Sequence, residues 1–171
     1  AVKAQTFIPK LFVANPWAIA FKHNSNDGYV VSSASDVLVK VTLDGNGVPS
    51  VVSVDADGGT TKVALIEVHK NPRGIVINNA DTRAYVYNFI SKDVSVVDLT
   101  ASPEVETARI QSTELPAPGS DAAKFLTGNE LFHSSRGEFD EGVSERMSNE
   151  GWQACSSCHP DGLSDGVVWA F

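Results

Sequence analysis

The sequence has little of what a disulfide framework, a membrane span or a nucleic-acid-binding surface requires. Only two of its 171 residues are cysteines, too few for a scaffold held together by several disulfides. No apolar run approaches the roughly 18 residues of a membrane span. The chain has 13 Lys and Arg against 21 Asp and Glu, a net charge of −8, which disfavours nucleic acid and favours a protein partner with a basic patch.

Residues 1–112 have the pattern of antiparallel β-structure. Val, Ile, Thr and Tyr occur in short runs separated by Asn, Asp, Gly and Pro, which is typical of strands joined by tight turns. We expect strands near 17–21, 28–33, 36–43, 49–54, 61–68, 73–78, 83–88, 92–98 and 104–110.

The same part of the chain contains a repeat. The stretch "NPWAIAFKHNSNDGYVVSSASDVLVKVTLD" from Asn15 aligns without gaps on "NPRGIVINNADTRAYVYNFISKDVSVVDLT" from Asn71, an offset of 56 residues. Several short strands repeated at such a period indicate a radial or solenoid array. The offset exceeds the roughly 40–50 residues of a propeller blade. Long hairpins in the turn-rich "DGNGVPS" and "DADGGTT" stretches would account for the difference.

The second copy, "PRGIVINNADTRAYVYNFISKDVSVVDL", resembles the YVTN-type β-propeller repeat, whereas the first copy departs from it at Ala18 and Ser32. The resemblance implies that residues 1–112 form propeller blades. A closed propeller needs at least about four blades, and this stretch supplies about two. We therefore expect its sheet edges to meet the remaining part of the same polypeptide or neighbouring subunits.

The character of the sequence changes after residue 111. Residues 113–119 predict a Pro-rich linker, and "SDAAKFLTGNELFHSSRG" predicts a helix with Ser120 as its N-cap and Gly137 just past its end. Gly128 and Phe132 are four residues apart, so they lie on one face of this helix.

The stretch "WQACSSCHPDG", which begins at Trp152, carries the strongest chemical signal. In a C-x-x-C-H segment the two thiols can form thioethers with haem, and the adjacent histidine can ligate the iron. A thioredoxin-like pair would need a βαβ context, a structural zinc site would need four protein ligands, and a disulfide here would close a very small ring. We predict one covalent haem c held by Cys155 and Cys158, with His159 as the proximal iron ligand.

The segments "GNELF" and "RMSNEGWQACSSCHPDGLSDGVVWAF" resemble the haem segment of the di-haem cytochrome c peroxidase/MauG-like family, in the variety fused to a YVTN propeller. The resemblance implies that residues 120–171 form a small α-helical cytochrome c-like segment, in which Gly128 and Phe132 pack against a C-terminal helix. A complete cytochrome domain has its sixth ligand and closing helix downstream of the motif. The sequence ends at Phe171, before both, so we expect an incomplete domain and a partial chain.

Several residues are candidates for further contact with the haem. Met147 and His133 are the two candidates within the sequence for the sixth iron ligand. A residue outside the sequence, another chain or water would serve otherwise. Trp152 and Trp169 flank the motif at distances that allow packing against the porphyrin.

Together these features predict a mainly β fold, a partial set of β-propeller-like antiparallel blades, followed by a small α-helical cytochrome c-like segment. The predicted function is electron transfer through one haem, in a periplasmic or otherwise exported protein. One alternative is the electron-feeding part of a di-haem peroxidase, whose second C-x-x-C-H does not occur in these residues. Another is a haem-stapled propeller that acts as a binding or sensor module.

Overall fold

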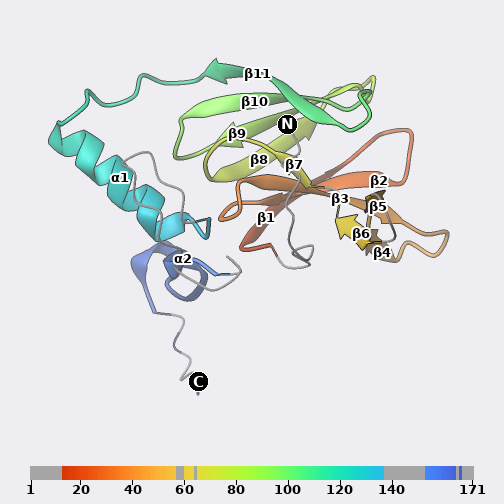
Figure 1. The fold of residues 1–171 in the computed structure, drawn as a ribbon, viewed down its shortest axis with the longest axis horizontal. Coiled ribbons are helices and arrows are strands. Elements are labelled where there is room, and N and C mark those ends of the chain that lie inside the picture. The colour runs from red at the N-terminus through yellow and green to blue at the C-terminus, as the bar shows by residue number, and fades with distance from the viewer. Residues whose placement is uncertain (1–12, 57–59, 64, 137–152, 165, 167–171) are drawn as a thin grey trace.

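The computed structural model describes residues 13–56, 60–63, 65–136, 153–164 and 166 (Figure 1). Within these ranges the chain is mainly antiparallel β-structure, with one five-stranded sheet, one four-stranded sheet, a separate two-stranded hairpin and few helices. The prediction of a mainly β fold is confirmed. No helix in the described ranges is long and apolar enough to cross a membrane.

The first sheet is built from consecutive antiparallel strands, β1 (Pro16–Phe21), β2 (Asp27–Ser32) and β3 (Val37–Leu43). Two short strands pair with different halves of β3. Strand β4 (Pro49–Val51) pairs with the C-terminal half, and β7 (Leu65–Glu67) pairs with the N-terminal half.

A hairpin of β5 (Ser53–Ala56) and β6 (Thr60–Val63) is inserted between these two halves. The predicted strands 49–54 and 61–68 are therefore each divided in two. The inserted hairpin includes most of the turn-rich stretch "DADGGTT", which was expected to lengthen the repeat. It accounts for part of the difference between the 56-residue offset and an ordinary blade.

The second sheet is an uninterrupted meander of β8 (Pro72–Ile77), β9 (Arg83–Asn88), β10 (Asp93–Asp98) and β11 (Val105–Gln111). Strands β1 and β8, which begin the two sheets, contact each other.

The two sheets repeat each other in backbone detail. The Ser33 N–H donates to the Asn15 carbonyl at 2.9 Å, and Phe89, 56 positions later, donates to the Asn71 carbonyl at the same distance. Asn15 and Asn71 both adopt left-handed backbone, with φ of 56° and 55°. Asparagine tolerates this conformation better than most residues. The predicted repeat is therefore present in the structure.

The hydrophobic core lies between the two sheets. The first sheet contributes Tyr29, Val31, Leu38, Ile66 and Val68, and the second contributes Ala84, Val86, Val97 and Leu99. Three polar side chains interact beside this core. The Tyr29 hydroxyl donates to Glu104 at 2.7 Å, and Lys40 pairs with the same carboxylate at 2.8 Å. Each sheet therefore uses the other to bury one of its faces.

Three short helical elements follow the sheets: α1 (Asp121–His133), α2 (Cys155–Cys158) and a 3-10 turn at Pro160–Gly162. The Ser120 hydroxyl accepts the Ala123 N–H, so the predicted N-cap is confirmed. The helix ends at His133, short of the predicted end just before Gly137, because Ser134 is extended and Ser135 bonds to the Ala34 carbonyl of the first sheet. Residues 113–119 contain neither helix nor strand.

These three elements do not define a cytochrome domain, so that part of the fold prediction stays a prediction. The closing helix that Gly128 and Phe132 were expected to contact is not found in the described residues.

One buried carboxyl, Asp36, lies where α1 meets the two sheets. Its Oδ1 accepts the Asn71 N–H at 2.8 Å. Burial raises the pKa of Asp36 from 3.8 to about 7, although the Asn71 N–H, Arg136 and Lys70 oppose the shift. Glu130 on α1 adds to it and itself pairs with Lys70 at 2.7 Å.

The raised pKa of Asp36 predicts that stability depends on pH. Between pH 4 and 7 the folded chain binds a proton that the unfolded chain has largely released, so the free energy of unfolding falls as the pH rises through this window. The fall amounts to roughly a few kcal/mol. Asp36→Asn, which keeps the acceptor oxygen, is expected to flatten the dependence in urea unfolding at several pH values. Asp121→Asn, at an exposed carboxylate, is the control. If the free energy of unfolding of Asp36→Asn changed with pH as in the unmodified chain, the prediction would be contradicted.

Candidate functional site

The C-x-x-C-H segment folds as one helical turn. Helix α2 spans Cys155–Cys158, and the His159 N–H donates to the Cys155 carbonyl at 3.0 Å, so the histidine directly follows the turn. Both thiols are free and half-buried. The turn therefore presents two thiols outside any disulfide, and an imidazole, from adjoining positions.

The segment is attached to the first sheet through the residues between the two cysteines. The Asn15 side-chain amide donates to the Ser156 hydroxyl at 3.1 Å, and the Ser157 hydroxyl donates to the Asn15 Oδ1 at 2.7 Å. The Ser157 hydroxyl also accepts the Ala154 N–H at 3.0 Å, which satisfies a backbone donor at the start of the helix. Asn15 thus fixes both serines of "CSSC".

Small buried side chains lie beneath this contact. Ala14, Ala34 and Ala154 form a separate buried cluster. The Ala34 carbonyl also accepts hydrogen bonds from the backbone and side chain of Ser135, just after α1. The turn between β2 and β3 therefore anchors both α1 and the C-x-x-C-H segment.

Replacing Asn15 tests this attachment. Asn15→Gly removes both side-chain hydrogen bonds but keeps the left-handed backbone accessible, whereas Asn15→Ala also imposes about 1 kcal/mol or more of backbone strain. We expect faster hydrogen exchange at residues 154–159 in both variants, and a lower free energy of unfolding in the alanine variant than in the glycine variant. Unchanged exchange in both variants would show that Asn15 does not hold the turn.

The histidines fall into two groups by their hydrogen bonds. His23 and His69 have Nδ1 next to Asp81 and Asp93 carboxylates, at 2.8 and 2.5 Å. In contrast, His159 and His133 have Nδ1 next to backbone carbonyl oxygens, of Leu163 at 3.0 Å and of Asn129 at 2.8 Å. A carbonyl can only accept, so Nδ1 carries the proton in His159 and His133, and Nε2 holds the lone pair that a metal ligand needs.

Burial lowers the pKa of His133, which keeps its imidazole neutral, the form that ligates metals. The ring makes edge contacts with Phe132 and Phe89, at centroid distances of 5.0 and 6.5 Å.

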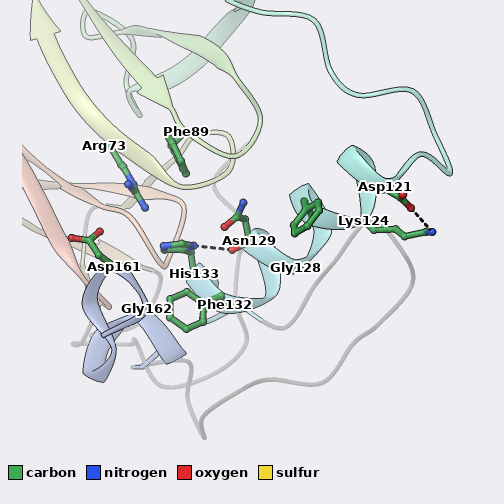
Figure 2. Close-up of a pocket in the computed structure, with 11 residues that line it drawn as sticks. Arg73, Phe89, Asp121, Lys124, Gly128, Asn129, Phe132, His133, Asp161 and Gly162 are labelled. Atoms are coloured by element: carbon green, nitrogen blue, oxygen red, sulfur yellow. Dashed lines mark hydrogen bonds and ion pairs between the residues drawn. The ribbon is translucent and has the colours of Figure 1, made fainter. Parts of the chain in front are cut away.

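A cleft of about 950 Å³ lies between α1 and the turn that follows His159 (Figure 2). This volume is at the upper end of the roughly 300–1,000 Å³ usual for ligand pockets. Its walls include Phe89 from the turn between β9 and β10, Phe125, Phe132 and His133 from α1, and Asp161 and Gly162 from the turn after His159. The predicted sixth-ligand candidate His133 and the segment after His159 therefore line the same space.

Arg73 of β8 also lines the cleft. Its guanidinium carbon is 4.1 Å from the Phe89 ring centroid and 4.6 Å from that of Trp17, and its Nε donates to the Asn71 Oδ1 at 2.8 Å. Burial lowers the pKa of Arg73, and the nearby Asp161 acts in the opposite direction. The second sheet thus brings a fixed cation to the cleft wall.

The structure covers only part of the predicted site. It describes Cys155, Cys158, His159 and His133, whereas Met147, Trp152 and Trp169 lie outside the described residues. Sequence reasoning did not identify Asn15 and Arg73 as site residues. The position of Asn15 at the head of the repeat was a usable signal, since the matching Asn71 also makes side-chain contacts.

The described residues give no support to the other interpretations of the two cysteines. No cluster of three or more metal-ligating side chains is found among them, as a structural zinc site would require. The paired strands there are antiparallel and form no βαβ unit of the thioredoxin kind.

Comparison with known proteins adds little to this description. No protein-family model and no curated protein matches the chain. Among solved structures, it is similar to a functionally unknown protein from Desulfotomaculum acetoxidans DSM 771, with a TM-score of 0.47 and 15% sequence identity. The match covers 60% of this chain and 30% of that protein. The interpretation of function therefore depends on the residues of the site.

Proposed function

We propose that this chain carries one haem c, bound through thioethers to Cys155 and Cys158 with His159 as axial ligand, and that it transfers electrons. The observation that carries the proposal is the single helical turn with two free thiols, followed by a histidine whose Nδ1 faces the Leu163 carbonyl. Metal-ligating histidines usually donate their second ring N–H in this way, which orients the ring and leaves Nε2 for the metal.

The lining of the cleft suits such a group. Asp161 and Gly162 connect the cleft to His159, but Cys155, Cys158 and His159 do not themselves line it. Phe89, Phe125 and Phe132 supply apolar surface, and Arg73 supplies a positive charge suited to a carboxylate such as a haem propionate. In this proposal His133 is the first candidate for the sixth ligand, because it lines the cleft in the neutral form with Nε2 available.

The bound haem would supply one-electron chemistry, and the protein would tune it through the axial ligands and the polarity of the pocket. Two strong-field axial ligands would favour electron transfer, and an open position would favour peroxide chemistry.

The two sheets are, in this proposal, blades of a YVTN-type propeller. Face-to-face stacking of meander sheets with neighbouring first strands supports this interpretation. The blades serve as the scaffold to which Asn15 attaches the haem segment. The protein would be exported, because haem is attached outside the bacterial cytoplasm, and the net charge of −8 would favour a basic redox partner.

The test is a spectrum of protein exported from a bacterium that has the haem-attachment machinery. After denaturation, addition of pyridine and reduction with dithionite, we expect one haem per chain to remain with the polypeptide. A chain exported in folded form without covalent haem would overturn the proposal.

Carbon monoxide then separates electron transfer from the alternatives. A reduced native protein that does not bind carbon monoxide has both axial positions occupied. His133→Ala is then expected to open the site to carbon monoxide, whereas Met147→Ala leaves it closed. The reverse pattern would assign the sixth position to Met147. Ready binding by the unmodified protein would favour the peroxidase or sensor function instead.

A further inference from the structure

The second sheet has an apolar face that points away from the first sheet. Cross-strand pairing places Val76 opposite Tyr85 and Tyr87 opposite Val94, and Val94 lies opposite Ile110. Residues directly opposite one another share a sheet face. We call this set the outer face of the second sheet: Val76, Tyr85, Tyr87, Val94 and Ile110.

In the first sheet the matching residues of β2 and β3 are buried. The 56-residue offset relates Tyr85, Tyr87 and Val94 to Tyr29, Val31 and Leu38, all three fully buried in the core between the sheets. Ile66 pairs with Leu38 as Ile110 pairs with Val94. Yet Ile66 is 4% exposed and Ile110 57% exposed. Tyr87 and Val76 are 40% and 62% exposed.

The first sheet has the reciprocal surface. In the internal contact, Ile75 and Ile77 of β8 pack against the core. Their counterparts in β1, Ile19 and Phe21, are 52% and 37% exposed. A single chain therefore carries both halves of the contact that already joins its two sheets.

We propose that the outer face of the second sheet binds the β1 side of a second copy of this chain, head to tail. The docked copy would place Ile19 and Phe21 where Ile75 and Ile77 lie in the internal contact. Val96 stands at the position of Lys40, so the outer face needs no counterpart to the Lys40–Glu104 pair. The contact would bury side chains of the same kind as the internal core.

Such a contact is heterologous, because the two partners use different surfaces. A pair of copies joined in this way still has one free outer face and one free β1 side. Further copies can therefore add, and the product is either a closed ring or an open filament. This geometry makes a prediction that a symmetric dimer would not make. A variant altered on the outer face and a variant altered on the β1 side should still bind each other, because each keeps the surface that the other has lost.

The test uses the full chain with its haem, measured by light scattering after size exclusion from about 1 to about 100 μM, a range that detects micromolar dissociation constants. We expect the unmodified chain to form oligomers whose mass rises with concentration. Tyr87→Glu and Ile19→Glu should each be monomeric. An equimolar mixture of the two variants should give a dimer that grows no further.

Controls separate this result from misfolding. Leu115→Glu places the same charge at an exposed apolar residue of the linker and should associate as the unmodified chain does. Circular dichroism and haem content should be unchanged in all three variants. An unmodified chain that stays monomeric at 100 μM would overturn the proposal and assign the outer face to a further repeat of a longer polypeptide. A mixture that stays monomeric although the unmodified chain associates would overturn the head-to-tail geometry.

Discussion

Replacement of both Cys155 and Cys158 by alanine is expected to abolish covalent haem attachment. Each thiol is free and belongs to the same helical turn, and each supplies one thioether in the proposed haem site. After extraction with acidified acetone, the unmodified chain should keep about one haem, and the double variant at least about tenfold less. The measurement is the pyridine spectrum of the extracted polypeptide.

Ser156→Ala is the matched control, because it changes a residue between the cysteines and removes a hydrogen bond to Asn15 but no thiol. It should keep its haem. Each single cysteine variant should keep one thioether and give a shifted spectrum, since one vinyl group stays unreacted. Retention of haem by the denatured double variant would exclude thioether attachment at these cysteines.

Replacement of Ile66 by alanine is expected to lower the free energy of unfolding by about 2–5 kcal/mol, the range for large-to-small changes in a core. Ile66 is 4% exposed and packs between the two sheets. Its removal leaves a cavity that rigid neighbouring strands can fill only in part. Urea unfolding at about 1 μM protein measures the change, and an unaltered slope would show that the extent of unfolding is the same.

Ile110→Ala provides a control with the same chemistry at the equivalent position of the second sheet. Ile110 is largely exposed, so its replacement should cost less than about 1 kcal/mol under conditions where the chain is monomeric. Equal losses in the two variants would mean that the outer face of the second sheet is as well packed as the core, contrary to the structure.

The sequence was sufficient for the features that depend on local pattern. Alternating apolar residues located the strands, because one face of each strand is buried. Ser120 marked the start of α1, because a hydroxyl at that position can accept a backbone N–H of the first turn. The gapless alignment of Asn15 on Asn71 anticipated the matching hydrogen bonds of the two sheets. The first two signals lie within a few residues of the feature they predict, and the third is a repeat that the sequence shows directly.

Features that depend on distant parts of the chain were not predictable in this way. The contact between Asn15 and "CSSC" joins residues 141 and 142 positions apart. No local pattern indicates such a pair. The division of the fourth strand of the first sheet into β4 and β7 was also missed, because both halves and the inserted hairpin share the same alternation of residues. The early end of α1 at His133 depends on the bond between Ser135 and Ala34.

The long reach of the Asn15 contact has a consequence for the order of folding. Strands β1, β2 and β3 are joined by short turns, whereas docking of the C-x-x-C-H turn onto Asn15 closes a loop of more than a hundred residues. Closing a long loop costs more entropy than closing a short one, and non-local contacts slow folding. We expect protection from exchange at residues 28–31 to precede protection at 155–158 in pulsed refolding experiments. Simultaneous protection would contradict this order. In the expected order the thiols would stay accessible for the proposed haem attachment while the sheets are already formed.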